Sequence, residues 1–213
     1  MDKNITNILG YGINSERFTI DDCFIAEAAR NRVIRIYDEI RADTIADATS
    51  TILCYNSEDS KLKPEERKPI ILAISSPGGS VLDGFALIDI MKNSITPIWT
   101  VNIGYCFSMA FHIFICGDKR FSLPSSIFLL HDGQTGNFDS TLKLQDYAEF
   151  EKKHRNTLIL DNILNHTTMS EKEYRRNERI EWYMFAEEAK RLGITDHILD
   201  EKISLFQLAD SYK

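Results

Sequence analysis

The stretch Ile74-Ser75-Ser76-Pro77-Gly78-Gly79-Ser80 decides the fold of this chain. It follows a run of branched apolar residues, 70–74, which is typical of a short strand buried on both faces. It precedes residues 81–91, in which apolar side chains recur at helical spacing. Ser80 stands three residues before Asp83, the spacing of a capping box at a helix start. We therefore predict a strand, a glycine turn and a helix N-terminus in succession.

The glycine turn also has a chemical interpretation. Gly78 and Gly79 carry no side chain, so another molecule can approach their backbone closely. The helix that follows adds N–H groups without intrahelical partners, and such donors can stabilise a negatively charged oxygen. Pro-Gly-Gly is also found in ordinary tight turns, so a functional interpretation needs support from other residues.

The composition is typical of a single globular domain. The 213 residues include 43% apolar residues, enough for a substantial core, and 27% charged residues. A formal net charge of −7 argues against a nucleic-acid-binding surface. No apolar run is long enough to span a membrane, and residues 1–6 lack the apolar core of a secretory signal. We expect a cytoplasmic protein with no nucleic-acid or membrane partner.

The cysteines indicate neither a metal site nor a disulfide framework. Cys23, Cys54, Cys106 and Cys116 have no metal-ligand spacing and lie in apolar or helical contexts. Reduced thiols are the expected state in a cytosolic protein.

Apolar patterns predict strands that alternate with helices along the chain. Strands are predicted at 33–37, 70–74, 98–104, 121–124, 127–130 and near 197–199. Helices are predicted at 20–29, 43–55, 81–94, 107–116, 140–165 and 186–193, with a short one near Ser170. Residues 57–68 are predicted to form an exposed charged loop. Repeated strand–helix alternation predicts an α/β fold.

Two residues downstream of the glycine turn add to its chemical interpretation. Ser108 stands at the first turn of a predicted buried helix, whose positive end favours an anion. His131 follows an apolar strand and can present a ring nitrogen as a general base. Taken singly, such a serine is more often a helix cap, and such a histidine a structural residue.

Four motifs occur together in a fixed order. They are Ser-Pro-Gly-Gly-Ser-Val at 76–81, Gly-Tyr-Cys-Phe-Ser-Met at 104–109, Leu-Pro-Ser-Ser at 123–126 followed by His131, and Ala-Glu-Glu-Ala-Lys-Arg-Leu-Gly-Ile-Thr-Asp at 186–196. The set resembles the proteolytic subunit of the Clp protease, from about Arg32 to the end of the chain. The resemblance implies an α/β fold of the ClpP/crotonase type, a spiral of strand–helix units with a protruding helical handle.

The resemblance also implies the domain boundaries. A single ClpP-like peptidase domain would comprise residues 31–213, with the handle at about 134–180. Residues 1–30 would form an N-terminal arm whose structure the sequence does not specify.

The resemblance assigns a role to four residues of the predicted site. Ser108 looks like the nucleophile and His131 like the general base. The backbone N–H groups of Gly79 and Met109 look like the oxyanion hole.

Glu181 is the candidate for the third member of a catalytic triad. It stands five residues before Ala186, where the family has an aspartate. Glutamate can serve, although its extra methylene moves the carboxylate. Asp132 is the nearer alternative in sequence, but neighbouring residues of a strand point to opposite faces. An exposed Glu181 without a catalytic role is the other alternative.

Other departures from the family indicate a divergent member. Cys106 and Phe107 replace the small residues that usually precede the serine, and Asp132-Gly133 replaces Gln-Pro. Cys106 is thereby an alternative nucleophile, although we expect it to pack in the core.

The preferred hypothesis is a serine endopeptidase that cleaves unfolded polypeptides or peptides inside an oligomeric chamber. The resemblance implies stacked heptameric rings of this chain and an AAA+ unfoldase as partner. The partner would use ATP, whereas this chain is expected to bind no metal and no cofactor. The alternatives are a non-catalytic ring subunit or scaffold, a crotonase-type acyl-CoA enzyme, and a relative of signal-peptide peptidases with a lysine base.

Overall fold

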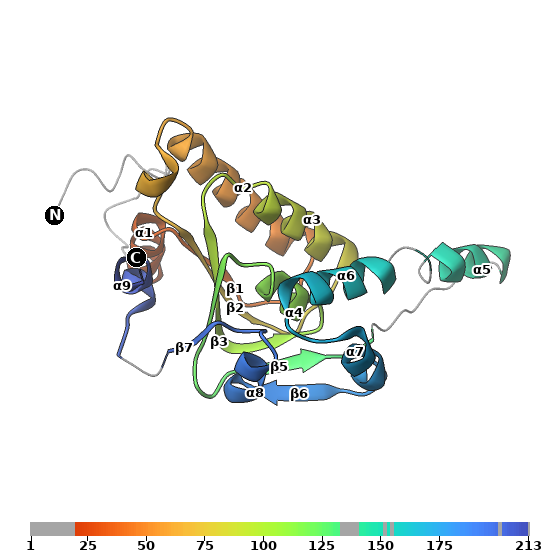
Figure 1. Cartoon of the computed structure of the whole chain (residues 1–213). Coiled ribbons are helices and arrows are strands. Elements are labelled where there is room, and N and C mark those ends of the chain that lie inside the picture. The colour runs from red at the N-terminus through yellow and green to blue at the C-terminus, as the bar shows by residue number, and fades with distance from the viewer. Residues whose placement is uncertain (1–19, 133–140, 151–152, 154–155, 200–201, 213) are drawn as a thin grey trace.

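The structure is a computed structural model of the chain, and it describes residues 20–132, 141–150, 153, 156–199 and 202–212. Residues 1–19 of the predicted arm (1–30) and residues 134–140, at the start of the predicted handle, lie outside the described residues. Within the described part, helices flank both faces of one mostly parallel sheet (Figure 1).

Strands and helices alternate along the chain as predicted, which confirms the α/β fold. The strands are β1 (Val33–Ile36), β2 (Ile70–Ser76), β3 (Ile98–Phe107), β4 (Lys119–Ser122), β5 (Ile127–Leu130), β6 (Trp182–Phe185) and β7 (His197–Ile198). The α-helices are α1 (Ile20–Arg30), α2 (Ala42–Asp59), α3 (Val81–Lys92), α4 (Met109–Phe114), α5 (Thr141–Phe150), α6 (Asn156–His166), α7 (Glu171–Asn177), α8 (Ala186–Arg191) and α9 (Leu208–Ser211). Short 3-10 helices are η1 (Pro64–Glu66) and η3 (Leu205–Gln207).

The long strand β3 lies at the branch point of the sheet. The strand order is β1-β2-β3-β4-β7, and β5 also pairs with β3 and carries β6 on its other side. The first half of β3 pairs with β4, and its last three residues, 105–107, pair with β5. Gly104 lies between these two halves, and a Cβ atom there would come within 2.6 Å of the Ser75 Oγ atom. A glycine at this bend therefore lets the two strands approach closely.

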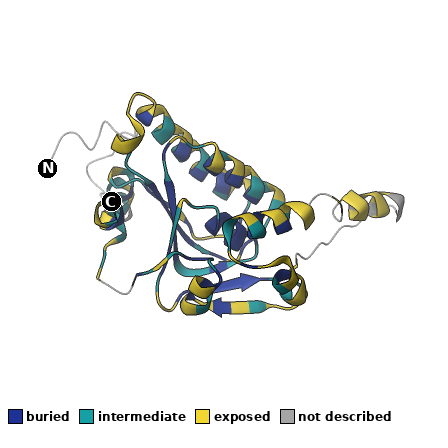
Figure 2. Ribbon diagram, viewed as in Figure 1, coloured by how far each residue is buried: buried dark blue, intermediate teal, exposed yellow. Residues whose placement is uncertain are grey.

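Strand β2 divides the core into two faces. Ile70, Leu72 and Ile74 pack toward helices α2, α3 and α4, whereas Ile71 and Ala73 pack toward the other face. All five side chains are at most 1% exposed, which confirms a strand buried on both faces (Figure 2). The following turn leads into α3 as predicted, since the Asp83 N–H donates to the Ser80 hydroxyl at 3.3 Å.

Helix α1 and the C-terminal segment (residues 203–212) cover the second face of the sheet. The Phe24 and Phe206 rings are in contact, with their centroids 5.5 Å apart. Leu208 of α9 is fully buried against this face. The Lys119 ammonium donates to the Tyr212 carbonyl at 2.8 Å and so fixes the end of α9. No helix was predicted in this segment from the sequence.

The predicted helix at 107–116 is wrong at its start. Strand β3 continues through Phe107, and α4 begins only at Met109. The apolar run from Ile98 onward does not by itself distinguish a buried strand from a buried helix. Ser108 therefore precedes the helix instead of lying in its first turn.

The predicted exposed loop at 57–68 is wrong in its first part. Helix α2 continues to Asp59, whose side chain is completely buried. The Arg32 guanidinium donates to both carboxylate oxygens of Asp59, at 2.5 and 2.7 Å, and the Thr96 hydroxyl donates at 2.7 Å. The Asp59 carboxylate can be buried because it is paired with Arg32. A local run of charged residues in the sequence does not reveal such a distant partner.

Two further differences concern the region before α8. Strand β6, which pairs antiparallel with β5, was not predicted. The predicted helix at 140–165 is described as α5 and α6, with residues 151–152 and 154–155 outside the described part. Helix α5 extends away from the other described elements (Figure 1). None of the helices in the described part is long and apolar enough to cross a membrane.

Candidate active site

Ser108 occupies a strained turn between β3 and α4. Its backbone has φ 52° and ψ −122°, in the left-handed region that side-chain-bearing residues rarely adopt. Such a conformation costs roughly 1–3 kcal/mol and persists only where the surrounding structure enforces it. The Ser108 N–H donates to the Leu129 carbonyl at 3.0 Å, which ties the turn to β5.

The glycine turn packs directly against Ser108. A Cβ atom on Gly78 would lie 2.5 Å from the Phe107 carbonyl oxygen, 2.7 Å from the Ser108 Cβ atom and 2.9 Å from the Met109 nitrogen. Gly78 also has φ +91°, so a side chain is excluded by both space and backbone conformation. The structure thus brings together two motifs that are distant in sequence.

The backbone bridge between Gly79 and Ile40 does not use the Gly79 N–H. The Ile40 N–H donates to the Gly78 carbonyl at 2.7 Å, and the Ser80 N–H donates to the Ile40 carbonyl at 2.8 Å. In this parallel bridge the N–H of the central residue, Gly79, points to the side away from Ile40. Met109 begins α4, so its N–H has no intrahelical partner.

His131 lies at the same edge of the sheet as Ser108. It directly follows β5, which runs parallel to the end of β3 with Phe107 opposite Leu129. The carboxyl ends of adjacent parallel strands meet at one edge, so Ser108 and His131 are neighbours there. The His131 side chain is half-buried.

Glu181 and His131 lie directly beyond the same end of the antiparallel pair β5–β6. Leu130 lies opposite Trp182 in the last pair of the ladder, and His131 and Glu181 are the next residues on the two chain segments. The Glu181 side chain is exposed, and its Oε2 atom accepts a hydrogen bond from the Tyr183 hydroxyl at 2.9 Å. Among the described side chains of this site, no hydrogen bond joins Ser108, His131 and Glu181 to one another. Catalytic hydrogen bonds are often long in unliganded structures and tighten when substrate binds.

The two sequence alternatives, Cys106 and Asp132, differ from each other in burial. Cys106 is completely buried within β3, and burial raises the pKa of its thiol well above the usual value. A protonated, inaccessible thiol is a poor nucleophile. Asp132 is exposed, and its backbone N–H donates to the Glu178 carbonyl at 2.6 Å.

His112 is a buried residue near the site that the sequence analysis missed. It lies one turn after Ser108 on α4, and its Nδ1 atom has no hydrogen-bond partner in the described part of the chain. Burial, and to a lesser extent the charge of His131, lower the pKa of His112 to about 4. Its backbone carbonyl accepts from the Asn162 side chain at 3.1 Å, which links α4 to α6. His112 stands four residues after Ser108 in the sequence, and this helical spacing was the signal that could have identified it.

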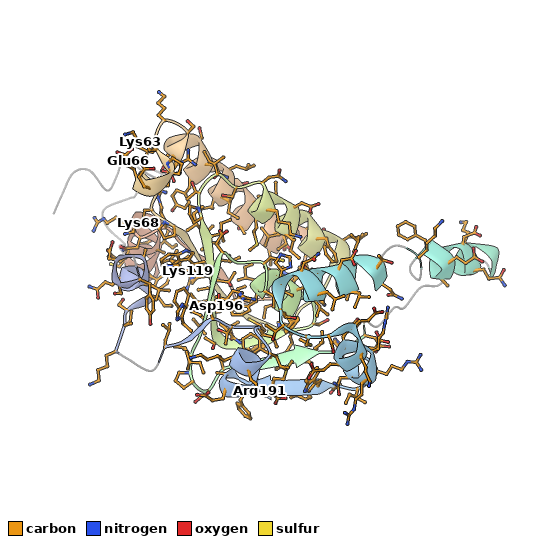
Figure 3. The ribbon with its side chains drawn as sticks, in the orientation of Figure 1. Lys63, Glu66, Lys68, Lys119, Arg191 and Asp196 are labelled. Atoms are coloured by element: carbon orange, nitrogen blue, oxygen red, sulfur yellow. The ribbon has the colours of Figure 1, made fainter. Side chains whose placement is uncertain are left out.

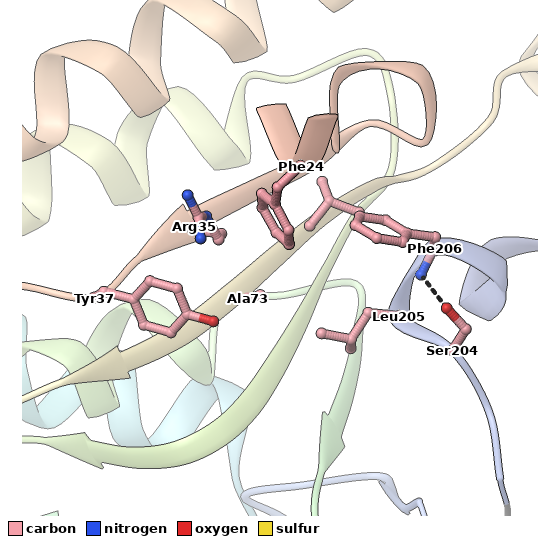
Figure 4. Close-up of a pocket in the computed structure, with 8 residues that line it drawn as sticks. Phe24, Arg35, Tyr37, Ala73, Ser204, Leu205 and Phe206 are labelled. Atoms are coloured by element: carbon pink, nitrogen blue, oxygen red, sulfur yellow. Dashed lines mark hydrogen bonds between the residues drawn. The ribbon is translucent and has the colours of Figure 1, made fainter. Parts of the chain in front are cut away.

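Two pockets of the described structure lie away from Ser108. One, of about 250 Å³, opens between α1, β1 and η3 (Figure 4). The other, of about 580 Å³, surrounds the Arg120–Asp196 ion pair. Neither is lined by Ser108 or His131. No group of three or more potential metal ligands occurs among the described residues.

The α/β fold and the ordered motifs agree with the resemblance to the Clp protease, and comparison with known proteins makes the family definite. The chain belongs to the Clp protease family, because the family model described as Clp protease matches residues 18–202. The ATP-dependent Clp protease proteolytic subunit of Deinococcus radiodurans is 28% identical over 174 residues. That alignment covers 81% of this chain and 82% of the relative.

Proposed function

We propose that this chain is a serine endopeptidase whose nucleophile is Ser108. The observation that carries the proposal is the strained backbone of Ser108, at φ 52° and ψ −122°. A sharp strand-to-helix turn of this kind exposes a serine hydroxyl and places the next backbone N–H beside it. A structural N-cap serine would instead have extended backbone and bond to its own helix, whereas the Ser108 side chain makes no such cap bond.

The residues around Ser108 can carry out acyl transfer. The Ser108 Oγ atom attacks the peptide carbonyl while His131 accepts the hydroxyl proton. The N–H groups of Gly79 and Met109 stabilise the oxyanion of the tetrahedral intermediate. His131 then returns the proton to the leaving amine, and a water molecule hydrolyses the acyl-enzyme by the same steps. Glu181 is the carboxylate proposed to orient His131.

Family membership supports the setting in which this chemistry occurs. We place the active sites inside a chamber of stacked heptameric rings of this chain, in the cytoplasm. The substrates are unfolded polypeptides, fed by an AAA+ unfoldase that consumes ATP. The name of the Deinococcus radiodurans relative, an ATP-dependent proteolytic subunit, supports this partner. The mechanism requires no metal or cofactor bound by this chain.

Covalent labelling with a fluorophosphonate tests the nucleophile directly. We expect one modified residue, Ser108, and complete loss of both labelling and peptide cleavage in Ser108→Ala with assembly unchanged. Cys106→Ala is the matched control two residues away, and it should keep both activities because Cys106 is buried. Labelling that persists in Ser108→Ala and vanishes in Cys106→Ala would overturn the assignment.

A non-catalytic ring subunit is the second candidate. The observation in its favour is that the Glu181 carboxylate bonds to Tyr183 and not to His131. An assembled wild-type protein that neither labels nor cleaves would select this candidate.

A further inference from the structure

The outer face of strands β3, β5 and β6 carries a row of three side chains beside the site. Phe107 lies opposite Leu129, and Leu129 lies opposite Tyr183. The Phe107 and Tyr183 rings are in edge-to-face contact, with centroids 5.8 Å apart and an interplanar angle of 84°. Since Phe107 immediately precedes Ser108, the tyrosine ring packs against the strand end that holds the proposed nucleophile.

Tyr183 also contacts the proposed third catalytic residue. Its hydroxyl donates to the Glu181 Oε2 atom at 2.9 Å. Glu181 directly precedes β6 and stands two positions before Tyr183, a spacing that puts two side chains of an extended segment on the same face. The hydrogen bond to Glu181 raises the pKa of Tyr183, as expected for a neutral phenol that donates to an ionised carboxylate.

Glu181 depends on Tyr183 because the described structure gives it no other side-chain partner. No ion pair with lysine or arginine involves Glu181 among the described residues. A glutamate has one more rotatable bond than an aspartate, and a free exposed side chain occupies several rotamers. A hydrogen bond to one carboxylate oxygen restricts this freedom and leaves the other oxygen, Oε1, available to a second donor.

The available donor is on the neighbouring strand. The register of β5–β6 ends at Leu130 opposite Trp182, and extending it by one residue would place His131 opposite Glu181. Directly opposite residues on antiparallel strands have Cβ atoms about 4.5–5.5 Å apart, within reach of an imidazole N–H and a carboxylate. With that extension, His131 and Glu181 share the face from which Tyr183 emerges.

We propose that Tyr183 is a positioning residue that holds the Glu181 carboxylate against His131. Phe107 fixes the tyrosine ring, and the tyrosine hydroxyl fixes the glutamate. In this way the longer glutamate acts where the family has an aspartate. The inference rests on the proposed function, because it requires His131 to act as the general base.

The test compares Tyr183→Phe with the wild-type protein in peptide cleavage. We expect kcat to fall about threefold to tenfold, the effect of one lost hydrogen bond, with KM unchanged. A nearby carboxylate raises the pKa of a histidine. The acid limb of the kcat–pH profile should therefore move to lower pH in the variant. A purely structural tyrosine would leave that limb in place.

Two controls make the result specific. Tyr37→Phe removes a hydroxyl from a tyrosine that is 52% exposed, as Tyr183 is, and it should have no effect. Glu181→Gln should lose most of the activity with the oligomer unchanged, and adding Tyr183→Phe to it should cost nothing further. That result would show that the Tyr183 hydroxyl affects cleavage only through the Glu181 carboxylate.

Unchanged or increased kcat in Tyr183→Phe would overturn the inference, as would an equal loss in the Glu181→Gln background. In both cases wild-type labelling at Ser108 would leave the proposed function standing. A wild-type protein that neither labels nor cleaves would overturn both together.

Discussion

Ser108 and Arg32 are the non-glycine residues with positive φ in the described part of the chain. Each stands where a strand meets another element, and each is held by long-range contacts. Arg32 is anchored by its bonds to Asp59, and Ser108 by β5 and by the close approach of Gly78. Backbone strain at these points is maintained by the surrounding fold, and at Ser108 it coincides with the proposed chemistry.

His112 provides a pH-dependent prediction at the residue scale. Its folded-state pKa of about 4 lies below the unfolded value of about 6.5. The unfolded state therefore binds more protons between these values, so stability falls as pH decreases from about 6.5 to 4, by about 3 kcal/mol in total. His112→Phe should reduce this loss, and it also removes a buried nitrogen that lacks a hydrogen bond.

Urea unfolding of wild type and His112→Phe at pH 7 and pH 4.5, at fixed protein concentration, measures the difference. Equal losses of stability in both proteins on acidification would contradict the assignment to His112.

Candidate site residues could be named from the sequence where they occur in a recognisable motif. Ser108 and His131 could be named because they occur in ordered motifs. The strain at Ser108 could not be predicted, because it arises from contact with Gly78 across the sheet. Tyr183 was missed because its hydrogen bond to Glu181 depends on a strand, β6, that was itself not predicted.

At the scale of elements, the ion pair between Arg32 and Asp59 joins three segments. It connects the end of α2 to the residue before β1, and Thr96, just before β3, bonds to the same carboxylate. The Arg32 and Asp59 side chains are only 14% and 1% exposed. Breaking a buried pair leaves an uncompensated charge, which is more costly than the pair is favourable.

We predict that Asp59→Asn lowers the free energy of unfolding by about 3–5 kcal/mol. Glu58→Gln is the matched control, because Glu58 contacts the same arginine at 3.4 Å but is 64% exposed. The control should lose less than about 1 kcal/mol. Chemical denaturation of both variants distinguishes them, and a similar loss in each would contradict the prediction.

The Arg32–Asp59 pair also predicts that the folded state loses stability at acidic pH. The hydrogen bond from Arg32 lowers the pKa of Asp59 in the folded state. The ionised Asp59 contributes its full stabilisation of the folded state above its unfolded-state pKa of about 3.9. This contribution is lost as the pH falls further. This part of the acid dependence should be absent in Asp59→Asn.

Elements were predicted well where one pattern dominates. Strand β5 was predicted with its observed bounds because an apolar run ends at a polar residue. Residues 98–116 were divided wrongly because the same apolar character continues through strand and helix. Asp59 was placed in an exposed loop because local charge does not reveal a partner 27 residues away.

At the scale of the whole molecule, the segment around α6 presents apolar side chains to solvent. Leu158 is 53% exposed and Ile180 55% exposed. Helix α5 extends beyond them, away from the sheet (Figure 1). Exposed apolar groups near the base of such an extension favour contact with a second protein surface.

We predict that rings of this chain associate face to face through residues 134–180. Light scattering should give the mass of a stacked assembly, and Leu158→Glu should reduce it toward that of a single ring. Leu62→Glu, next to Lys63 at the far end of the molecule (Figure 3), is the control and should leave the mass unchanged. A monomeric wild-type protein at micromolar concentration would contradict the prediction.

The C-terminal segment affects when the protein can complete its fold during synthesis. Its residues Leu205, Phe206 and Leu208 close the second face of a sheet whose first strands lie near the other end of the chain. A ribosome releases the polypeptide from its N-terminal end. The strands β1 to β3 therefore emerge long before the residues that shield them from water. Until those residues appear, Trp99 and Phe121 remain accessible to chaperones, and to other nascent chains, on that side of the sheet.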